Sequence, residues 1–92
     1  MKNNPKSDFL SSRVQYLPIS LIRPNPQQPR HSFDEEGLAE LAASIRSCGI
    51  LQPLTVRRTE KGYQLIAGER RLRAARIAGL REVPCLVARV DE

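Results

Sequence analysis

The stretch GERRLRAAR, residues 68–76, is the most informative part of this chain. It places three arginines within four residues directly behind a glycine, where an apolar run that ends at Ala67 changes into helix-forming residues. The first turn of a helix has unpaired backbone N–H groups and partial positive charge, which favour anions. Guanidinium groups on that turn add paired donors suited to phosphate oxygens, and Gly68 has no Cβ to block close approach. The stretch predicts a phosphate-binding helix start.

The arginines of this stretch cannot all face one phosphate, because successive helix residues are rotated by about 100°. Arg70 and Arg71 on the first turn are the predicted ligands. Arg73 is predicted to pair with Glu69 four residues back, and Arg76 to be solvated. Glu69 is predicted to support the helix start, with a catalytic role as the second choice. The alternative for the whole stretch is a basic exposed helix face, which spacing alone does not exclude.

Alternating apolar residues predict four strands in the rest of the chain. They run over residues 14–19, 54–59, 63–67 and 82–90, and the two middle strands form a hairpin. Pro84 predicts that the last strand lies at an edge of the sheet or pairs only beyond the proline.

Helical periodicity predicts two helices. The first is capped by Ser32 or Asp34, ends at Gly49, and has one apolar stripe: Leu38, Leu41, Ala42 and Ile45. The second spans Glu69 to Ala78, stops at Gly79, and faces inward through Leu72, Ala75, Ile77 and Ala78. The order strand-helix-strand-strand-helix-strand predicts an α+β fold, a small mixed β-sheet with two main helices.

Length and charge set the outline of the molecule. Ninety-two residues permit one domain, with a loose polar tail over residues 1–13 and the domain over 14–92. The net charge is +5, and residues 47–92 hold most of the basic surplus. A phosphate-rich partner follows from that charge, and the alternative is a soluble basic surface without a target.

Two cysteines exclude a disulfide framework, and their spacing, with the single His31, fits no zinc site. Cys48 and Cys85 are predicted to be small, mostly buried residues in a reducing compartment. No apolar run approaches membrane-spanning length, so the sequence predicts a cytoplasmic protein without membrane contact.

The GERRxRAA pattern at residues 68–75 resembles the signature of the N-terminal domain of ParB-type chromosome and plasmid partition proteins. The segments RPNPQQPR at 23–30 and GILQPLTV at 49–56 agree with that family in order and spacing. The resemblance covers about residues 14–90. It implies the ParB/sulfiredoxin-like fold, binding of CTP, and a nucleotide that closes a clamp around DNA.

The resemblance also implies which residues bind the nucleotide. Two side chains of the proline-rich segment would lie near the triphosphate, the second segment would form a wall around the base, and the glycine-arginine stretch would hold the phosphates. These residues are Gln28, Arg30, Gly49, Ile50, Gln52, Gly68, Glu69, Arg70 and Arg71.

Full-length partition proteins continue beyond this domain. By resemblance, a later helix supplies phosphate and Mg²⁺ contacts, a helix-turn-helix binds the DNA site, and a further domain dimerises. The sequence ends at Glu92, and truncation is the favoured interpretation over a natural short protein. The fragment is then expected to bind CTP weakly and to lack specific DNA binding. The whole protein is expected to be at most a slow CTP hydrolase, and the fragment to have no such activity.

The resemblance further implies a nucleoid-associated protein whose domain self-associates when nucleotide binds and whose N-terminal tail contacts a ParA-type ATPase. Three rival functions share the fold or the composition. Sulfiredoxin repairs peroxiredoxins with a cysteine after the motif glycine, a position that Glu69 occupies here. A nucleotide-dependent kinase for serine or another small molecule would use Glu69 as a base. The third is a pure interaction module.

Overall fold

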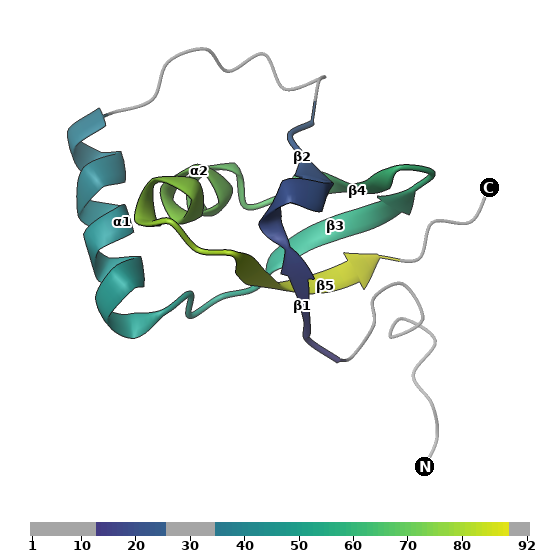
Figure 1. Ribbon diagram of the computed structural model, residues 1–92, viewed down its shortest axis with the longest axis horizontal. Helices are drawn as coiled ribbons and strands as arrows, with labels where there is room; N and C mark the ends of the chain where they lie inside the picture. Colours follow the sequence, from purple (N-terminus) through teal and green to yellow (C-terminus); the bar gives the residue numbers. More distant parts are fainter. Residues whose placement is uncertain (1–12, 26–34, 89–92) are drawn as a thin grey trace.

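The computed structural model describes residues 13–25 and 35–88. Along the chain the elements are β1 (Gln15–Pro18), the short 3₁₀ turn η2 (Ile19–Leu21), β2 (Ile22–Arg23), α1 (Glu35–Cys48), β3 (Leu54–Thr59), β4 (Gly62–Ala67), α2 (Glu69–Ala78) and β5 (Glu82–Ala88) (Figure 1). Three predicted features lie outside the described residues: the tail apart from its last residue, the helix caps at 32 and 34, and the strand end at 89–90.

The strands form one mixed five-stranded sheet in the order β1-β5-β3-β4-β2. The pairs β1–β5 and β3–β4 are antiparallel, whereas β3–β5 and β2–β4 are parallel. The predicted α+β class with two helices is confirmed. Strand β2 was not predicted, because two residues are too few to show a period; it pairs with β4 through Ile22 and Tyr63.

Of the two alternatives predicted for Pro84, the edge position is wrong, because β5 is an inner strand; pairing only beyond the proline holds for the side that faces β3 and not for the side that faces β1. β5 lies between β1 and β3, but the two neighbours pair with different halves of it. β1 pairs with residues 82–85, and β3 pairs only from Cys85 onward, beyond the proline. Pro84 therefore lies where β5 has one paired neighbour, and its missing N–H removes no bond to β3.

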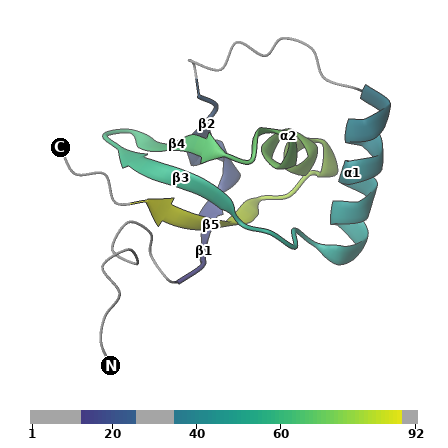
Figure 2. The ribbon, with the colours of Figure 1, turned by 180° about the vertical axis from the view of Figure 1, so that it is seen from behind.

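Helix α2 lies between the sheet and α1, which stands away from the strands (Figures 1 and 2). Its Leu72 and Ala75 belong to the core above the sheet, together with buried residues of all five strands. Ala74, also fully buried, packs instead against α1 at Leu38, Ala42 and Ile45. Small alanines on two sides of α2 let both layers approach it closely, so the second helix is buried on two faces.

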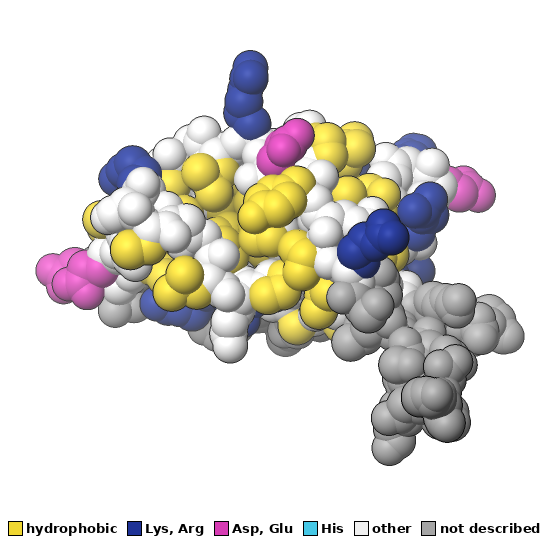
Figure 3. Space-filling model, turned by 90° about the horizontal axis from the view of Figure 1, so that it is seen from below, with side chains coloured by type: hydrophobic (Ala, Val, Ile, Leu, Met, Phe, Trp, Pro, Cys, Tyr) yellow, Lys and Arg dark blue, Asp and Glu magenta, His cyan; other side chains and the backbone are white. Residues whose placement is uncertain are grey.

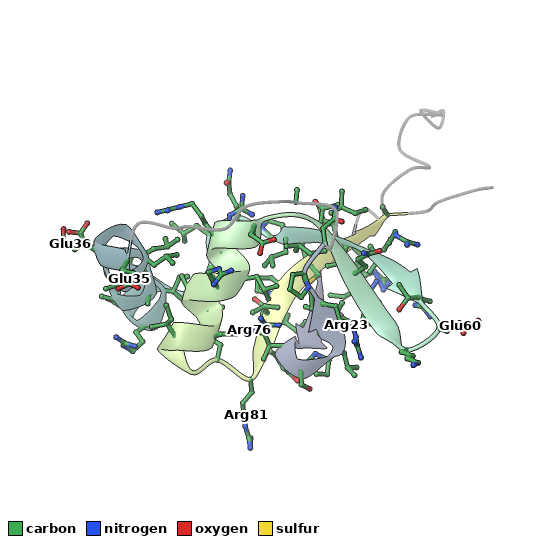
Figure 4. The ribbon with its side chains drawn as sticks, turned by 90° about the horizontal axis from the view of Figure 1, so that it is seen from above. Arg23, Glu35, Glu36, Glu60, Arg76 and Arg81 are labelled. Atoms are coloured by element: carbon green, nitrogen blue, oxygen red, sulfur yellow. The ribbon has the colours of Figure 1, made fainter. Side chains whose placement is uncertain are left out.

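Three side chains differ from the sequence prediction. Ile77 is 52% exposed rather than inward-facing, because it lies about 200° around the helix from Ala75. Cys48 is exposed at the end of α1, whereas Cys85 is buried as predicted. Arg76 is not merely solvated: its Nη2 donates a 3.0 Å hydrogen bond to the carbonyl of Ile22, which ties α2 to β2 (Figure 4).

Both helices end as the sequence predicts. Gly49 and Gly79 have φ values of 80° and 81°, and their N–H groups donate to carbonyls of the preceding turn. Neither described helix is long and apolar enough to cross a membrane.

Neither of the described α-helices covers the face of the sheet opposite α2 (Figures 1 and 2). Side chains that alternate with the core, such as the 66% exposed Tyr16, point away from the helices. Hydrophobic side chains gather on the side of the molecule where β1 and β5 lie (Figure 3).

Candidate functional site

The start of α2 has the geometry that the sequence predicts for an anion site. Gly68 has φ 111° and ψ 32°, and its carbonyl accepts the first helical bond, from the N–H of Leu72, at 2.8 Å. Gly68 has no side chain that could cap the helix, and no cap bond is found there among the described residues, so the N–H groups of the first turn can bind an anion. A Cβ on Gly68 would lie 3.2 Å from Leu54 Cγ and 3.3 Å from Arg71 Nη1. The position therefore requires glycine for its backbone angle and for its space.

A cavity of about 640 Å³ lies beside this helix start. Its walls are α1, the connection between α1 and β3, and the first turn of α2. The lining residues are Leu41, Ser44, Ile45, Gly49, Ile50, Leu51, Gln52, Arg70 and Arg71. The volume is typical of a small-molecule site, and the two charged residues among the described lining residues are arginines. The cavity is thus suited to a mostly uncharged body with an anionic group at one end.

Five of the nine predicted site residues line this one cavity. They are Gly49, Ile50, Gln52, Arg70 and Arg71. Gly68 and Glu69 directly precede Arg70 without lining the cavity themselves, and Gln28 and Arg30 lie outside the described residues. The structure therefore brings together two segments that are almost 20 residues apart in the sequence.

The two arginines have different surroundings. Arg70 is exposed, whereas Arg71 is half-buried. Arg71 Nη1 donates to the carbonyl oxygens of Pro53 at 3.0 Å and Gln52 at 3.5 Å. Arg71 therefore fastens the cavity wall to the start of α2, a role that the sequence did not indicate. Arg70 carries the charge that remains accessible.

Glu69 is the unusual residue of the site. Its Oε1 is buried and has no hydrogen-bond partner among the described residues. A buried polar atom without a partner costs about 1–3 kcal/mol, and more when it is charged. Because this oxygen is buried, a ligand or a neighbouring side chain can bond to it only after a local rearrangement. One carboxylate does not fit a magnesium site by itself, and the described residues hold no cluster of three His, Cys, Asp or Glu side chains.

Sequence reasoning missed the part of the wall that comes from α1. Leu41 and Ile45 line the cavity together with Ser44. Both apolar residues were recognised as members of the buried stripe, but a stripe gives no signal that its edge also borders a cavity. Leu51 is 82% exposed and also lines the cavity. The sequence predicts it only as part of the wall that the second segment forms, and not as one of the nine binding residues.

The cysteines give no support to sulfiredoxin-type chemistry. Cys85 is fully buried, and burial raises the pKa of its thiol to about 11. A thiol with that pKa is a poor nucleophile at neutral pH, because almost none of it is thiolate. Cys48 is exposed and precedes the cavity residue Gly49, but Glu69 takes the place after the motif glycine.

Comparison with known proteins gives consistent results. The model of the ParB N-terminal domain family matches residues 3–92. Stage 0 sporulation protein J of Bacillus subtilis is 52% identical over 85 residues, which are 92% of this chain and 30% of that protein. Chromosome-partitioning protein Spo0J of Thermus thermophilus is 63% identical over 74 residues, which are 80% of this chain and 28% of that protein.

Solved structures agree with the sequence comparison. C-terminally truncated ParB from Caulobacter crescentus, complexed with CTP-γ-S, matches with a TM-score of 0.79 at 45% identity, over 88% of this chain and 47% of that one. The same protein complexed to the centromeric parS site matches with a TM-score of 0.75 at 48% identity, over 88% and 42%. Sulfiredoxin from Arabidopsis thaliana matches with a TM-score of 0.71 at 29% identity, over 82% and 83%.

The chain spans less than a third of the length of these two curated relatives. The family model nevertheless covers almost all of it, and the three family-like segments lie within the match. The chain therefore belongs to the ParB N-terminal domain family.

Proposed function

We propose that this chain is the CTP-binding domain of a ParB-type chromosome or plasmid partition protein. The observation that carries the proposal is the shared cavity of about 640 Å³, which joins Gly49–Gln52 to the two arginines at the start of α2. A Caulobacter relative with the same fold and 45% identity was crystallised with CTP-γ-S.

We propose a separate task for each part of the site, which the geometry supports. Arg70 and the N–H groups of the first turn of α2 bind the phosphates, because they supply charge and donors that no side-chain cap occupies. Backbone groups of the 49–52 segment contact the base. Arg71 acts as a positioning residue, since its bonds to Gln52 and Pro53 fix the distance between the two halves.

The affinity expected from these contacts is modest. Each charge-assisted hydrogen bond contributes about 1.5–3 kcal/mol, and the costs of association offset part of the sum. A dissociation constant of about micromolar to millimolar follows. Such a site senses a nucleotide at cellular concentration, which is the property that a nucleotide-gated clamp on DNA requires.

Within this proposal the whole protein is a cytoplasmic, nucleoid-associated DNA clamp. The same proposal includes three further features. The domain self-associates when the nucleotide binds, its tail contacts a ParA-type ATPase, and a later segment supplies the Mg²⁺ ligands.

Thermal-shift measurements with CTP, ATP, GTP and UTP test the proposal, each with and without magnesium. We expect CTP alone to raise the melting temperature of the chain, and Arg70→Ala to abolish that shift. Arg81→Ala is the matched control, because Arg81 is an exposed arginine that projects away from the cavity (Figure 4). Equal shifts with all four nucleotides, or an unchanged CTP shift in Arg70→Ala, would contradict the assigned site.

The rival kinase function is tested in the same samples. Labelled ATP, ADP or CTP is incubated with free serine, and phosphoserine is measured. The orphan Oε1 of Glu69 is the one observation that favours such a base. Phosphoserine that disappears in Glu69→Gln would replace CTP sensing with catalysis as the function of the site at the start of α2.

A further inference from the structure

A second cavity lies at the far end of the sheet from the candidate nucleotide site. Its volume is about 630 Å³, and it is bordered by β2 and by the end of the β3–β4 hairpin. The lining residues are Arg23, Pro24, Thr59, Glu60, Lys61, Tyr63 and Gln64. The two cavities have no described lining residue in common, and α1 and the hairpin tip lie at opposite ends of the ribbon (Figures 1 and 2).

Strand register places a row of polar side chains beside this cavity. Arg23 of β2 pairs with Gln64 of β4, which pairs in turn with Arg57 of β3. Because registered neighbours share a face of the sheet, these three side chains lie on the same side. Gln64 Oε1 accepts bonds from Arg57 Nε at 3.1 Å and Nη2 at 2.8 Å. This orientation leaves the amide N–H groups of Gln64 as donors between two arginines.

The charges at this end of the sheet are not balanced. Arg57 is held by a neutral amide, and Arg58 lies 5.6 Å from the centre of the Tyr63 ring, so neither cation is neutralised by its contact. Arg23 and Lys61 are exposed at the cavity. Among the residues that the structure describes, Glu60 is the only acidic one that lines this cavity, and it projects outward from the hairpin tip (Figure 4). The described part of the hairpin end therefore holds four cations and one anion.

We propose that this cavity, defined here as the hairpin groove, binds backbone phosphates of duplex DNA without reading the sequence. Arg23, Lys61 and the amide of Gln64 supply donors along an open groove, and Arg57 adds charge next to it. A free nucleotide fits less well, because the contact with Arg58 already engages the aromatic ring that could stack on a base. Cations spread along a strand pair instead match the repeating charge of a phosphate backbone.

The experiment measures binding of a random-sequence duplex to the 92-residue chain by fluorescence anisotropy over a series of salt concentrations, without nucleotide. The logarithm of the affinity falls as the logarithm of the salt concentration rises, and each lost phosphate contact makes this negative slope shallower by about 0.9. The double variant Arg23→Ala/Lys61→Ala should therefore make the slope shallower by about 2 and weaken binding roughly ten-fold at low salt. Glu60→Gln should tighten binding, a gain that misfolding cannot imitate.

The control double variant is Arg46→Ala/Arg81→Ala, which removes the same charge from exposed positions elsewhere. It should keep the wild-type slope. Equal losses of affinity in both double variants would show that the attraction is diffuse and would refute the proposed DNA site in the hairpin groove. A wild-type chain that binds no duplex at low salt would also refute it. Displacement of the DNA by equimolar pyrophosphate or CTP would assign the groove to a small phosphorylated ligand instead.

Discussion

Replacement of Gly68 by alanine tests the central geometry of the site. Gly68 has φ 111°, where a side chain strains the backbone, and its new Cβ would lie 3.2 Å from Leu54 Cγ and 3.3 Å from Arg71 Nη1. Leu54 is fully buried and cannot move without disturbing the core. Arg71 can move, but only by loosening its 3.0 Å bond to Pro53. The substitution should thus lower stability and open the cavity wall together.

The magnitude is obtained by comparison with Gly79→Ala. Gly79 also has a positive φ, 81°, but a Cβ there would meet nothing within 4 Å. Its replacement should cost only the backbone strain, about 1–2 kcal/mol. Gly68→Ala adds a cost of about 1–3 kcal/mol for overpacking, so the free energy of unfolding should fall by about 2–5 kcal/mol in total. For a domain of this size, each kcal/mol lowers the melting temperature by about 4–8 °C.

The assay is thermal and urea unfolding of the two variants and the wild type, followed by circular dichroism. Gly68→Ala should melt at least about 4 °C below Gly79→Ala and lose its CTP shift, whereas Gly79→Ala should keep that shift. Equal destabilisation of the two variants would refute the role given to the contacts around Gly68. A folded Gly68→Ala variant with a normal CTP shift would refute the link between this glycine and the cavity.

Three further outcomes follow from the core and from α2. Leu72→Ala removes a fully buried side chain between α2 and the sheet and should lower the free energy of unfolding by about 2–5 kcal/mol in urea titrations. Arg76→Ala removes the bond to the Ile22 carbonyl, so the amide protons of β2 should exchange faster with solvent while the melting temperature falls by only a few degrees, for a loss of about 1 kcal/mol. A thiol reagent should modify exposed Cys48 quickly and buried Cys85 only on unfolding. Because burial raises the Cys85 pKa from 9.0 to about 11, this thiol should lower the folding stability as pH rises through that range, and the fall should be smaller in Cys85→Ala.

Local chemistry was sufficient to predict the elements with strong end signals. The second helix runs from Glu69 to Ala78 in both sequence and structure, because Gly68 and Gly79 mark its two ends and the arginines and alanines between them favour helix. The β3–β4 hairpin was predicted for similar reasons, since a Gly-containing turn separates two alternating runs.

Features that depend on distant parts of the chain could not be predicted. Strand β2 exists because β4 offers it a free edge, which two residues of sequence cannot reveal. The burial of Ala74 depends on α1 packing on the far side of α2. Sequence spacing describes one face of an isolated helix, so a helix enclosed by two layers shows more buried positions than its own period predicts.

The arginines show the same limit at the functional site. Arg70, Arg71 and Arg76 are alike in sequence, yet two of them donate to backbone carbonyls, at Pro53 and Ile22, that lie 18 and 54 residues away in the chain. Guanidinium groups bind carbonyls and phosphates with the same donors, so the sequence cannot assign either partner. In the folded chain Arg71 and Arg76 hold α2 to its surroundings, which leaves Arg70 as the arginine at the cavity that can bind a phosphate without loosening the fold. For this reason Arg70→Ala, rather than Arg71→Ala, separates loss of nucleotide from loss of structure.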